Sequence, residues 1–207
     1  PGWLAPAERE RAMRFAGARL RQRYVAGRAS LRRLLADRTG DDPARLVLEE
    51  DANGKPRLRG DPLAFNLSHA GRHALLAIGP AGRELGVDIE DIRGIADVES
   101  LTAICLSVAE RAAFAGFREE ADRREHFLRL WVRKEACLKA MGEGLRIAPD
   151  EFSVGFALPG AEWPARVRDT ELRVTDLEPG IAGFAAAIAV TGTGPMPPLA
   201  PLARLAT

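Results

Sequence analysis

Glu135 and Lys139 are two ionisable residues in a stretch that otherwise has the pattern of a core helix. At 100° per residue, the apolar side chains between residues 126 and 145 form one continuous arc made of Phe127, Leu130, Trp131, Leu138 and Met141. The arc places Glu135 and Lys139 at its edge and Arg129, Arg133 and Ala140 on the opposite side. An unpaired carboxylate on a packed face is costly. Glu135 therefore either forms an i,i+4 pair with Lys139, worth about 0.2–0.5 kcal/mol, or belongs to a functional site.

Asp88 and Glu90 offer two more carboxylates, on a predicted strand over residues 84–91. The strict alternation puts Leu85, Val87 and Ile89 on one face and the two acids on the other. Same-face neighbours on a strand are about 6.6 Å apart, so both side chains could reach one divalent cation. Gly86 leaves room beside them. The alternative is an edge strand with a solvated acidic face.

Ser68 and His69 lie at the end of a third predicted element, the strand over residues 62–69. The apolar run 74–78 is its expected hairpin partner. Earlier in the chain, residues 46–48 predict a short strand, and Lys55 follows a tight Asn53-Gly54 turn. His69 at such a position is either a ligand-binding residue or a structural histidine in a turn.

The remaining elements are arranged as helix and then strands, twice over. Helices are predicted over residues 7–35, with possible breaks at Gly17 and Gly27, and over 98–117 as one or two helices, with a capping box beginning at Ser107. The helix that carries Glu135 ends at Gly142. Further strands are predicted at 152–156, 165–167, 172–177 and 184–190, and the Pro-rich tail 191–207 is expected to be extended and loosely held. The expected fold class is α+β, with two similar α+β units at 1–83 and 84–190.

Composition points to a globular protein of a reducing compartment. Hydrophobic residues make up 46% and charged residues 29% of the 207 residues. The apolar run 181–190 is about half the ~20 residues that a membrane helix needs, so a buried strand is expected there. Cys105 and Cys137, far apart in sequence, favour free thiols in a cytoplasmic protein. The chain opens without a secretion signal, and because it begins at Pro1 we expect residues to precede it in the native protein.

The charges are divided unevenly along the chain. Residues 1–83 hold 16 Lys and Arg against 9 Asp and Glu, which gives +7, whereas residues 84–207 hold 14 against 20, which gives −6. A basic half beside an acidic half suits a polyanion on one side and a metal or basic partner on the other. Ordinary solvated charge is the alternative.

Three motifs, taken in order and spacing, resemble those of the 4′-phosphopantetheinyl transferases of the surfactin-synthetase-activating type. They are Phe65-Asn66-Leu67-Ser68-His69-Ala70-Gly71, then Gly86-Val87-Asp88-Ile89-Glu90, then Trp131-Val132-Arg133-Lys134-Glu135-Ala136 with Lys139 and Gly142-Glu143-Gly144-Leu145. The resemblance runs from about residue 11 to residue 190. It implies transfer of the phosphopantetheine arm of coenzyme A to a serine of an apo acyl or peptidyl carrier protein, with adenosine 3′,5′-bisphosphate released.

The resemblance also implies a pseudo-two-fold pair of α+β subdomains in one monomer, with the active site at their interface, and it assigns roles to single residues. Asp88, Glu90 and Glu135 would hold Mg²⁺, which prefers oxygen ligands. Lys139 would lie near the pyrophosphate, and Glu135 could accept the proton of the serine directly or through water. The coenzyme would be bound by Lys55, Ser68 and His69 on the 3′-phosphate side and by Arg11 and Arg23 at the basic rim. Two positions depart from the family pattern: Glu8 stands where a phosphate-binding lysine is expected, and Tyr24 stands in place of a threonine.

Two other function classes compete with this interpretation. The Arg-rich first helix could bind nucleic acid through phosphate contacts, although aromatic residues are few there and the sequence pI of about 8.4 is below that of a typical basic domain. The same three carboxylates could also serve a metal-dependent phosphodiesterase, which would release its product to water. We expect neither nucleic acid nor membrane as a partner.

Overall fold

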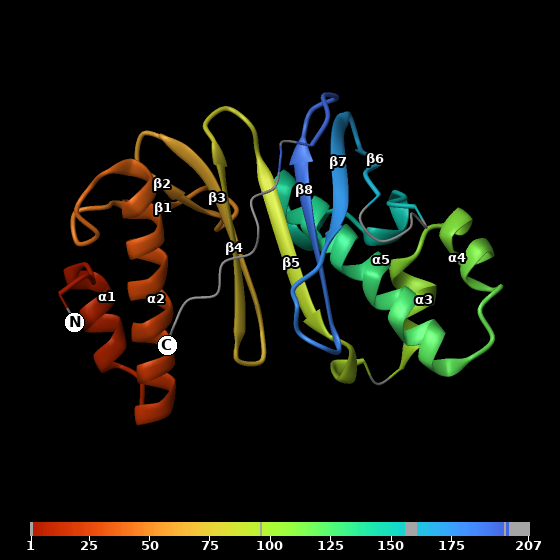
Figure 1. The fold of residues 1–207 in the computed structure, drawn as a ribbon, viewed down its shortest axis with the longest axis horizontal. Helices are drawn as coiled ribbons and strands as arrows, with labels where there is room; N and C mark the ends of the chain where they lie inside the picture. The colour runs from red at the N-terminus through yellow and green to blue at the C-terminus, as the bar shows by residue number, and fades with distance from the viewer. Residues whose placement is uncertain (1, 96, 156–160, 197, 199–207) are drawn as a thin grey trace.

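The computed structural model describes residues 2–95, 97–155, 161–196 and 198. Its front part holds two helices and two small sheets (Figure 1). The elements are α1 (Pro6–Met13), α2 (Ala18–Thr39), β1 (Leu48–Glu50), β2 (Pro56–Leu58), β3 (Leu63–Ala70) and β4 (His73–Pro80). β1 pairs with β2 and β3 pairs with β4, both antiparallel. The predicted hairpin is therefore confirmed, while the single front helix is two, because the chain breaks and restarts with Gly17 at the N-cap of α2.

The rear part is built on a four-stranded antiparallel sheet in the order β5-β8-β7-β6. The strands are β5 (Leu85–Asp91), β6 (Trp163–Val167), β7 (Thr170–Leu177) and β8 (Phe184–Thr191), and the helices are α3 (Val98–Cys105), α4 (Val108–Phe114) and α5 (Glu120–Met141), with short 3-10 turns η1 (Ile92–Gly94), η2 (Gly144–Arg146) and η3 (Pro149–Glu151). Ser107 caps α4 in the predicted capping box. α5 ends at Gly142 in the left-handed conformation, at φ 71°, as its sequence predicts.

Helix α5 lies against β5 and β8, with α3 and α4 on its outer side (Figure 1). From Phe127 to Ala140 the helix is buried on more than its apolar arc, because Arg133 and Ala140, which the wheel places opposite that arc, are buried as well. Arg133 forms two hydrogen bonds with Asp176 of β7, at 2.7 and 2.8 Å. Lys134 forms an ion pair with Glu110 of α4 at 2.8 Å. Strand β7 and helix α4, which a helical wheel does not encode, thus supply partners for the polar side.

The predicted α+β class is confirmed. The division at residue 83 stays a prediction, and so does the pseudo-two-fold relation between the units, which differ in their sheets. The strand predicted at 152–156 is wrong for residues 152–155, which form no ladder in the described chain, and residue 156 lies outside the described residues. Most of the tail from residue 197 is also outside them. Across the described ranges, no helix is long and apolar enough to cross a membrane.

Candidate active site

Asp88 contacts two side chains from other elements, Ser68 and Lys139, where the front and rear parts of the chain touch. The Asp88 carboxylate on β5 is 2% exposed. Its Oδ1 accepts hydrogen bonds from the Ser68 hydroxyl of β3 at 2.8 Å and from the Lys139 ammonium of α5 at 2.6 Å. Lys139 also donates to the Ser68 oxygen, at 3.0 Å. The structure thus joins one residue from each of the three sequence motifs.

Glu90 and Glu135 lie close enough to Asp88 to sense its charge. The pKa of each carboxyl is raised, first by burial and then by the negative charge of Asp88, while Lys139 lowers it in part. Asp88 Oδ2 is buried and accepts no hydrogen bond from any described residue. A buried carboxylate oxygen of this kind is expensive unless a cation or a donor satisfies it.

These features fit an oxygen-liganded divalent cation. The Glu135 carboxyl senses the charges of Asp88, Glu90 and Lys139, and one buried oxygen of Asp88 is left unsatisfied among the described residues. In the described part of the chain, no three Asp, Glu, His or Cys side chains already stand in a ready-made ligand cluster. The near oxygen of Asp88 is bonded to Lys139 at 2.6 Å. The chemistry of the donor set, all oxygen, is the one that Mg²⁺ prefers.

Gly86 explains how α5 comes so near to β5. A Cβ atom at this position would lie 2.2 Å from the carbonyl oxygen of Ala136 and 2.3 Å from the backbone nitrogen of Ala140. Any side chain would push the helix away. The missing side chain therefore sets the distance across which Glu135 and Lys139 face Asp88, which is a stronger role than the room beside the carboxylates that the sequence indicated.

Of the two alternatives for Glu135, the i,i+4 ion pair with Lys139 does not form. The Lys139 ammonium turns across to Asp88 of β5, with an N–O distance of 2.6 Å. Glu135 senses Lys139 only as a charge that lowers its pKa. Lys139 therefore joins α5 to the strand that carries Asp88.

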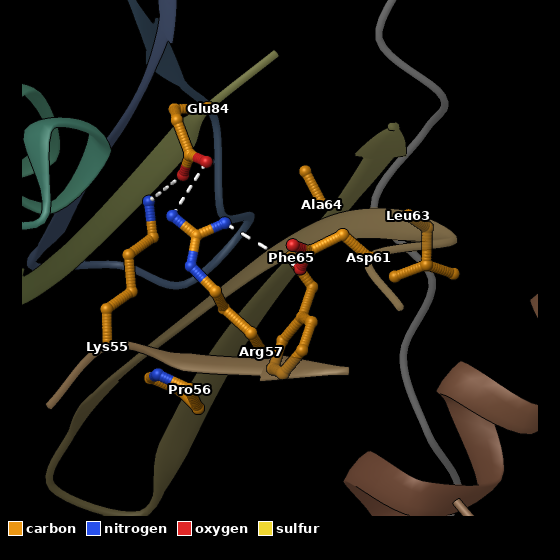
Figure 2. A pocket seen from close by; sticks show the side chains of 8 residues that line it. All are labelled: Lys55, Pro56, Arg57, Asp61, Leu63, Ala64, Phe65 and Glu84. Carbon is orange, nitrogen blue, oxygen red and sulfur yellow. Dashed lines mark hydrogen bonds and ion pairs between the residues drawn. The ribbon is translucent and has the colours of Figure 1, made fainter. Parts of the chain in front are cut away.

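Lys55 lies at the joint between the two parts of the chain and is 9% exposed. Its ammonium donates to Glu84 at 2.7 Å and to the carbonyl oxygens of Leu85 and Ala140, both at 3.1 Å. Figure 2 shows Lys55 and Arg57 meeting the carboxylate of Glu84 at a small pocket. An ammonium has three N–H donors, so Lys55 would contact a phosphate only after releasing one of these acceptors. Its role at the 3′-phosphate stays a prediction.

His69 and the two rim arginines lie apart from the carboxylates. His69 is exposed and belongs to the face of β3 opposite to Ser68. Arg23 of α2 donates a hydrogen bond to the carbonyl of Gly71, in the turn that follows His69, so these two predicted residues lie near the same end of the β3–β4 hairpin. Arg11 places its guanidinium 5.6 Å from the centre of the Tyr24 ring.

Glu8 is structural. Its carboxylate is 2.6 Å from the Arg32 guanidinium, which is itself 2% exposed, and accepts from the backbone nitrogen of Ala5 at the start of α1. Arg32 also donates to the carbonyl of Leu46 at 2.9 Å. The departure from the family pattern at this position therefore ties α1 to α2 and to the loop before β1.

Sequence reasoning assigned no role to Asn66, which is 5% exposed in the middle of β3. Its carboxamide oxygen accepts a hydrogen bond from the backbone nitrogen of Val87 at 2.9 Å. An asparagine inside an apolar strand is unfavourable unless it has a specific partner. A polar asparagine between the apolar residues Phe65 and Leu67 is visible in the sequence and could have marked Asn66. Trp131, predicted as core, packs partly buried against the main hydrophobic cluster, and Cys105 and Cys137 are free and buried.

Comparison with known proteins adds family information. Residues 84–189 match the family model described as 4′-phosphopantetheinyl transferase superfamily, and residues 2–81 match one described as 4′-phosphopantetheinyl transferase, N-terminal. The chain is 33% identical over 199 residues to the 4′-phosphopantetheinyl transferase HetI of Nostoc, covering 94% of this chain and 81% of that protein.

Other relatives match over shorter stretches. The human L-aminoadipate-semialdehyde dehydrogenase-phosphopantetheinyl transferase is 31% identical over 153 residues, which cover 69% of this chain and 49% of the human protein. The chain thus spans about half the length of this relative. Among solved structures, the holo-[acyl-carrier-protein] synthase of Thermotoga maritima is similar with a TM-score of 0.41 and 22% identity, over 52% of this chain and 62% of that one.

Proposed function

Because this chain belongs to the 4′-phosphopantetheinyl transferase superfamily, we propose that it transfers the phosphopantetheine arm of coenzyme A to a serine of an apo carrier protein. The other product is adenosine 3′,5′-bisphosphate. The observation that supports this best is the contact of Ser68, Asp88 and Lys139, one residue from each family motif, at a single buried carboxylate. The wider proposal is a monomeric cytoplasmic enzyme whose active site lies between units 1–83 and 84–190.

Asp88, Glu90 and Glu135 are proposed as the Mg²⁺ ligands. Bound Mg²⁺ supplies neutralisation of the charge that develops on the pyrophosphate as the bond to phosphorus breaks. The support is the unsatisfied Oδ2 of Asp88 and the raised pKa of Glu90 and Glu135, which comes first from burial and then from the negative charge of Asp88. A divalent cation would bind the unsatisfied oxygen of Asp88 and would favour the charged form of Glu90 and Glu135.

Lys139 forms an ion pair with Asp88, its charge acts on both glutamates, and 28% of its side chain is exposed. We propose that it contacts the pyrophosphate and stabilises charge on the departing bisphosphate, since a preorganised donor acts where charge develops. Glu135 stands four residues before it, on the same helix face. It is the proposed proton acceptor for the incoming serine hydroxyl, either directly or through a water molecule.

The coenzyme's 3′-phosphate end is proposed to bind at the β3–β4 hairpin and α2. Ser68 and His69 lie at the end of β3, Arg23 reaches the following turn, and Arg11 lies with Tyr24 at the basic rim. This surface belongs to the part of the chain with the +7 charge balance, which suits an anionic ligand. Lys55 joins this set only if it releases one of its three acceptors.

The test is mass gain on a carrier protein. Purified chain, coenzyme A and Mg²⁺ are mixed with a panel of apo acyl and peptidyl carrier proteins, and intact mass is followed. We expect addition of one phosphopantetheine group, loss of transfer on chelation of Mg²⁺, and loss of transfer in Asp88→Ala and Glu135→Ala proteins that keep their circular dichroism. Cleavage of coenzyme A without any acceptor would instead identify a phosphodiesterase, and no reaction with any carrier in the panel would overturn the assignment.

A further inference from the structure

The boundary between β3 and β5 is held by side chains instead of a backbone ladder. The two strands lie side by side (Figure 1), and the bonds between them join residue 66 to 87 and residue 68 to 88, so both strands run in the same direction. Over the residues that the structure describes, however, β3 forms a ladder with β4 alone and β5 with β8 alone. The free edge of β5 must therefore satisfy its backbone groups in another way.

Two buried side chains from the front part form hydrogen bonds with two backbone groups of that edge. The carboxamide oxygen of Asn66 accepts the Val87 N–H at 2.9 Å, and the ammonium of Lys55 donates to the Leu85 carbonyl at 3.1 Å. These two backbone groups flank Gly86, the residue whose missing side chain lets α5 approach. The segment before Asp88 is thus held from one side by Asn66 and Lys55 and from the other by the backbone of α5.

Asparagine suits the position at 66 for a chemical reason. The partner is a backbone N–H, so the side chain must offer an acceptor, and a carboxamide offers one without charge. An aspartate would accept the same hydrogen bond but would bring a further negative charge toward Asp88, Glu90 and Glu135. A leucine of similar size would leave the Val87 N–H without its acceptor in a site where Asn66 is 5% exposed.

We propose that Asn66 is a positioning residue for the transfer reaction, which acts by fixing β5 against β3 so that Asp88 stands level with Ser68 and Lys139. Val87 directly precedes Asp88, so a shift of its N–H shifts the carboxylate. The inference rests on the proposed function. It assigns Asn66 no contact with substrate; the hydrogen bond acts through Asp88.

The experiment compares three variants of the full chain: Asn66→Leu, Asn66→Asp and Val167→Ala. Val167 is fully buried on β6, at the opposite edge of the sheet from β5, so its truncation removes stability without touching the boundary. For each protein we measure Tm, kcat per folded enzyme, the KM for coenzyme A, the Mg²⁺ concentration at half-maximal rate, and the rise in Tm that Mg²⁺ produces without substrate.

We expect Asn66→Leu to lose ~tenfold or more in kcat, as small misplacements of reacting groups do, with a higher half-saturating Mg²⁺ concentration and a smaller Mg²⁺-induced rise in Tm. Asn66→Asp keeps the acceptor for the Val87 N–H and adds a negative charge, so its loss of kcat should be clearly smaller than that of Asn66→Leu. Val167→Ala lowers Tm but leaves kcat per folded enzyme and Mg²⁺ dependence unchanged. If Asn66→Leu yields no folded protein, Asn66→Gln, which displaces the acceptor by one methylene, replaces it with the same expectation.

The outcomes separate the two proposals. A parent enzyme that modifies no carrier protein overturns the proposed function. A parent that does, together with an Asn66→Leu enzyme of parental kcat and Mg²⁺ dependence, overturns the positioning role alone. Equal losses in Asn66→Leu and Asn66→Asp, or in Asn66→Leu and Val167→Ala, also overturn it, because the acceptor would then not be what matters.

Discussion

Helices α2 and α5 have the same length and the same kind of end, yet they serve the fold differently. Each has 22 residues and stops at a glycine in the left-handed conformation. α2 buries only four residues, all in its second half: Leu31, Arg32, Leu35 and Ala36. α5 buries ten, spread from Phe127 to Ala140. Most charged residues on α2 are therefore solvated, whereas a charged residue in the buried part of α5 needs an oppositely charged partner or a ligand.

The first half of α2 shows the contrast most clearly. Leu20 there is 59% exposed, and the exposed Arg23 lies one turn further along the helix. On α5, the neighbours Arg133 and Lys134 are 2% and 0% exposed and each is bound to a carboxylate of another element. The four predictions that follow make three comparisons, each between a residue of α5, or of the strand under it, and a matched residue of α2.

The largest effect is expected from Lys134→Met. The ammonium of Lys134 is 2.8 Å from Glu110 and donates to the carbonyl of Pro149, so its removal leaves the carboxylate of Glu110, 2% exposed, without its cation. Breaking a buried ion pair from one side costs about 3–5 kcal/mol. Urea unfolding should show that loss, while Arg33→Met on the exposed side of α2 should stay within about 0.5 kcal/mol of the parent. Equal losses would mean that the two helices are not buried differently.

Next comes Lys139→Met, compared with Arg38→Met. Both residues are the basic side chains of the last turn of their helix. We expect Lys139→Met to lower kcat on the order of a hundredfold, as removal of a preorganised donor does, and Arg38→Met to leave it unchanged. Steady-state kinetics with coenzyme A and Mg²⁺ saturating decides this. A Lys139→Met enzyme within a few-fold of the parental kcat would end the catalytic assignment.

A smaller loss of stability is expected from Gly86→Ala. The new methyl group would lie 2.2 Å from the Ala136 carbonyl oxygen, so β5 and α5 must separate. Overpacking of this kind costs about 1–3 kcal/mol, and the separation moves Asp88 away from Lys139, so kcat should fall as well. Thermal unfolding and the transfer assay are run on the same preparation. A variant with unchanged Tm and kcat would show that the helix does not need this close approach.

The matched change on α2, Gly27→Ala, should have the smallest effect and the opposite sign. Gly27 is in the helix interior, and no described atom outside its own helix backbone lies within 4 Å of a Cβ placed there. Alanine in an exposed helix interior is better than glycine by about 0.5–1 kcal/mol. Urea unfolding should therefore show a small gain. A loss would place a ligand or another segment against this face of α2.

The sequence predicted the site elements because their signals are local. Alternation marks the strand that carries Asp88 and Glu90, and the wheel marks Glu135 and Lys139 as misplaced on an apolar face. What it could not predict are partners from distant parts of the chain. Lys139 bonds to a strand 51 residues earlier, and Lys55 bonds to Ala140, which is 85 residues later. A rule for i,i+4 neighbours has no access to either contact.

The same limit explains the errors in the fold. Arg133 was assigned to an outer face because a wheel shows which side chains cluster but not how many layers cover them. Of the two possible breaks in the front helix, the one at Gly17 is confirmed and the one at Gly27 is not, because only Gly17 lies where the chain turns from α1 into α2. Residues 152–155 have a strand-like composition but are held by other bonds, such as the Val154 N–H donating to Glu110.

The pairing of β5 with β8 sets an order of events during synthesis. Leu85 lies opposite Val190, and Asp88 opposite Ala187, so the strand that carries the central carboxylate gains its ladder only after about a hundred further residues have left the ribosome. Until then the backbone groups of β5 that later pair with β8 are unpaired, on a strand that carries the apolar residues Leu85, Val87 and Ile89. Such an open edge favours aggregation. A nascent chain that stops before β8 can hold a folded β3–β4 hairpin but no sheet around Asp88. Pairing over such a sequence distance is slow, so the edge of β5 stays open until β8 has been made and has folded back.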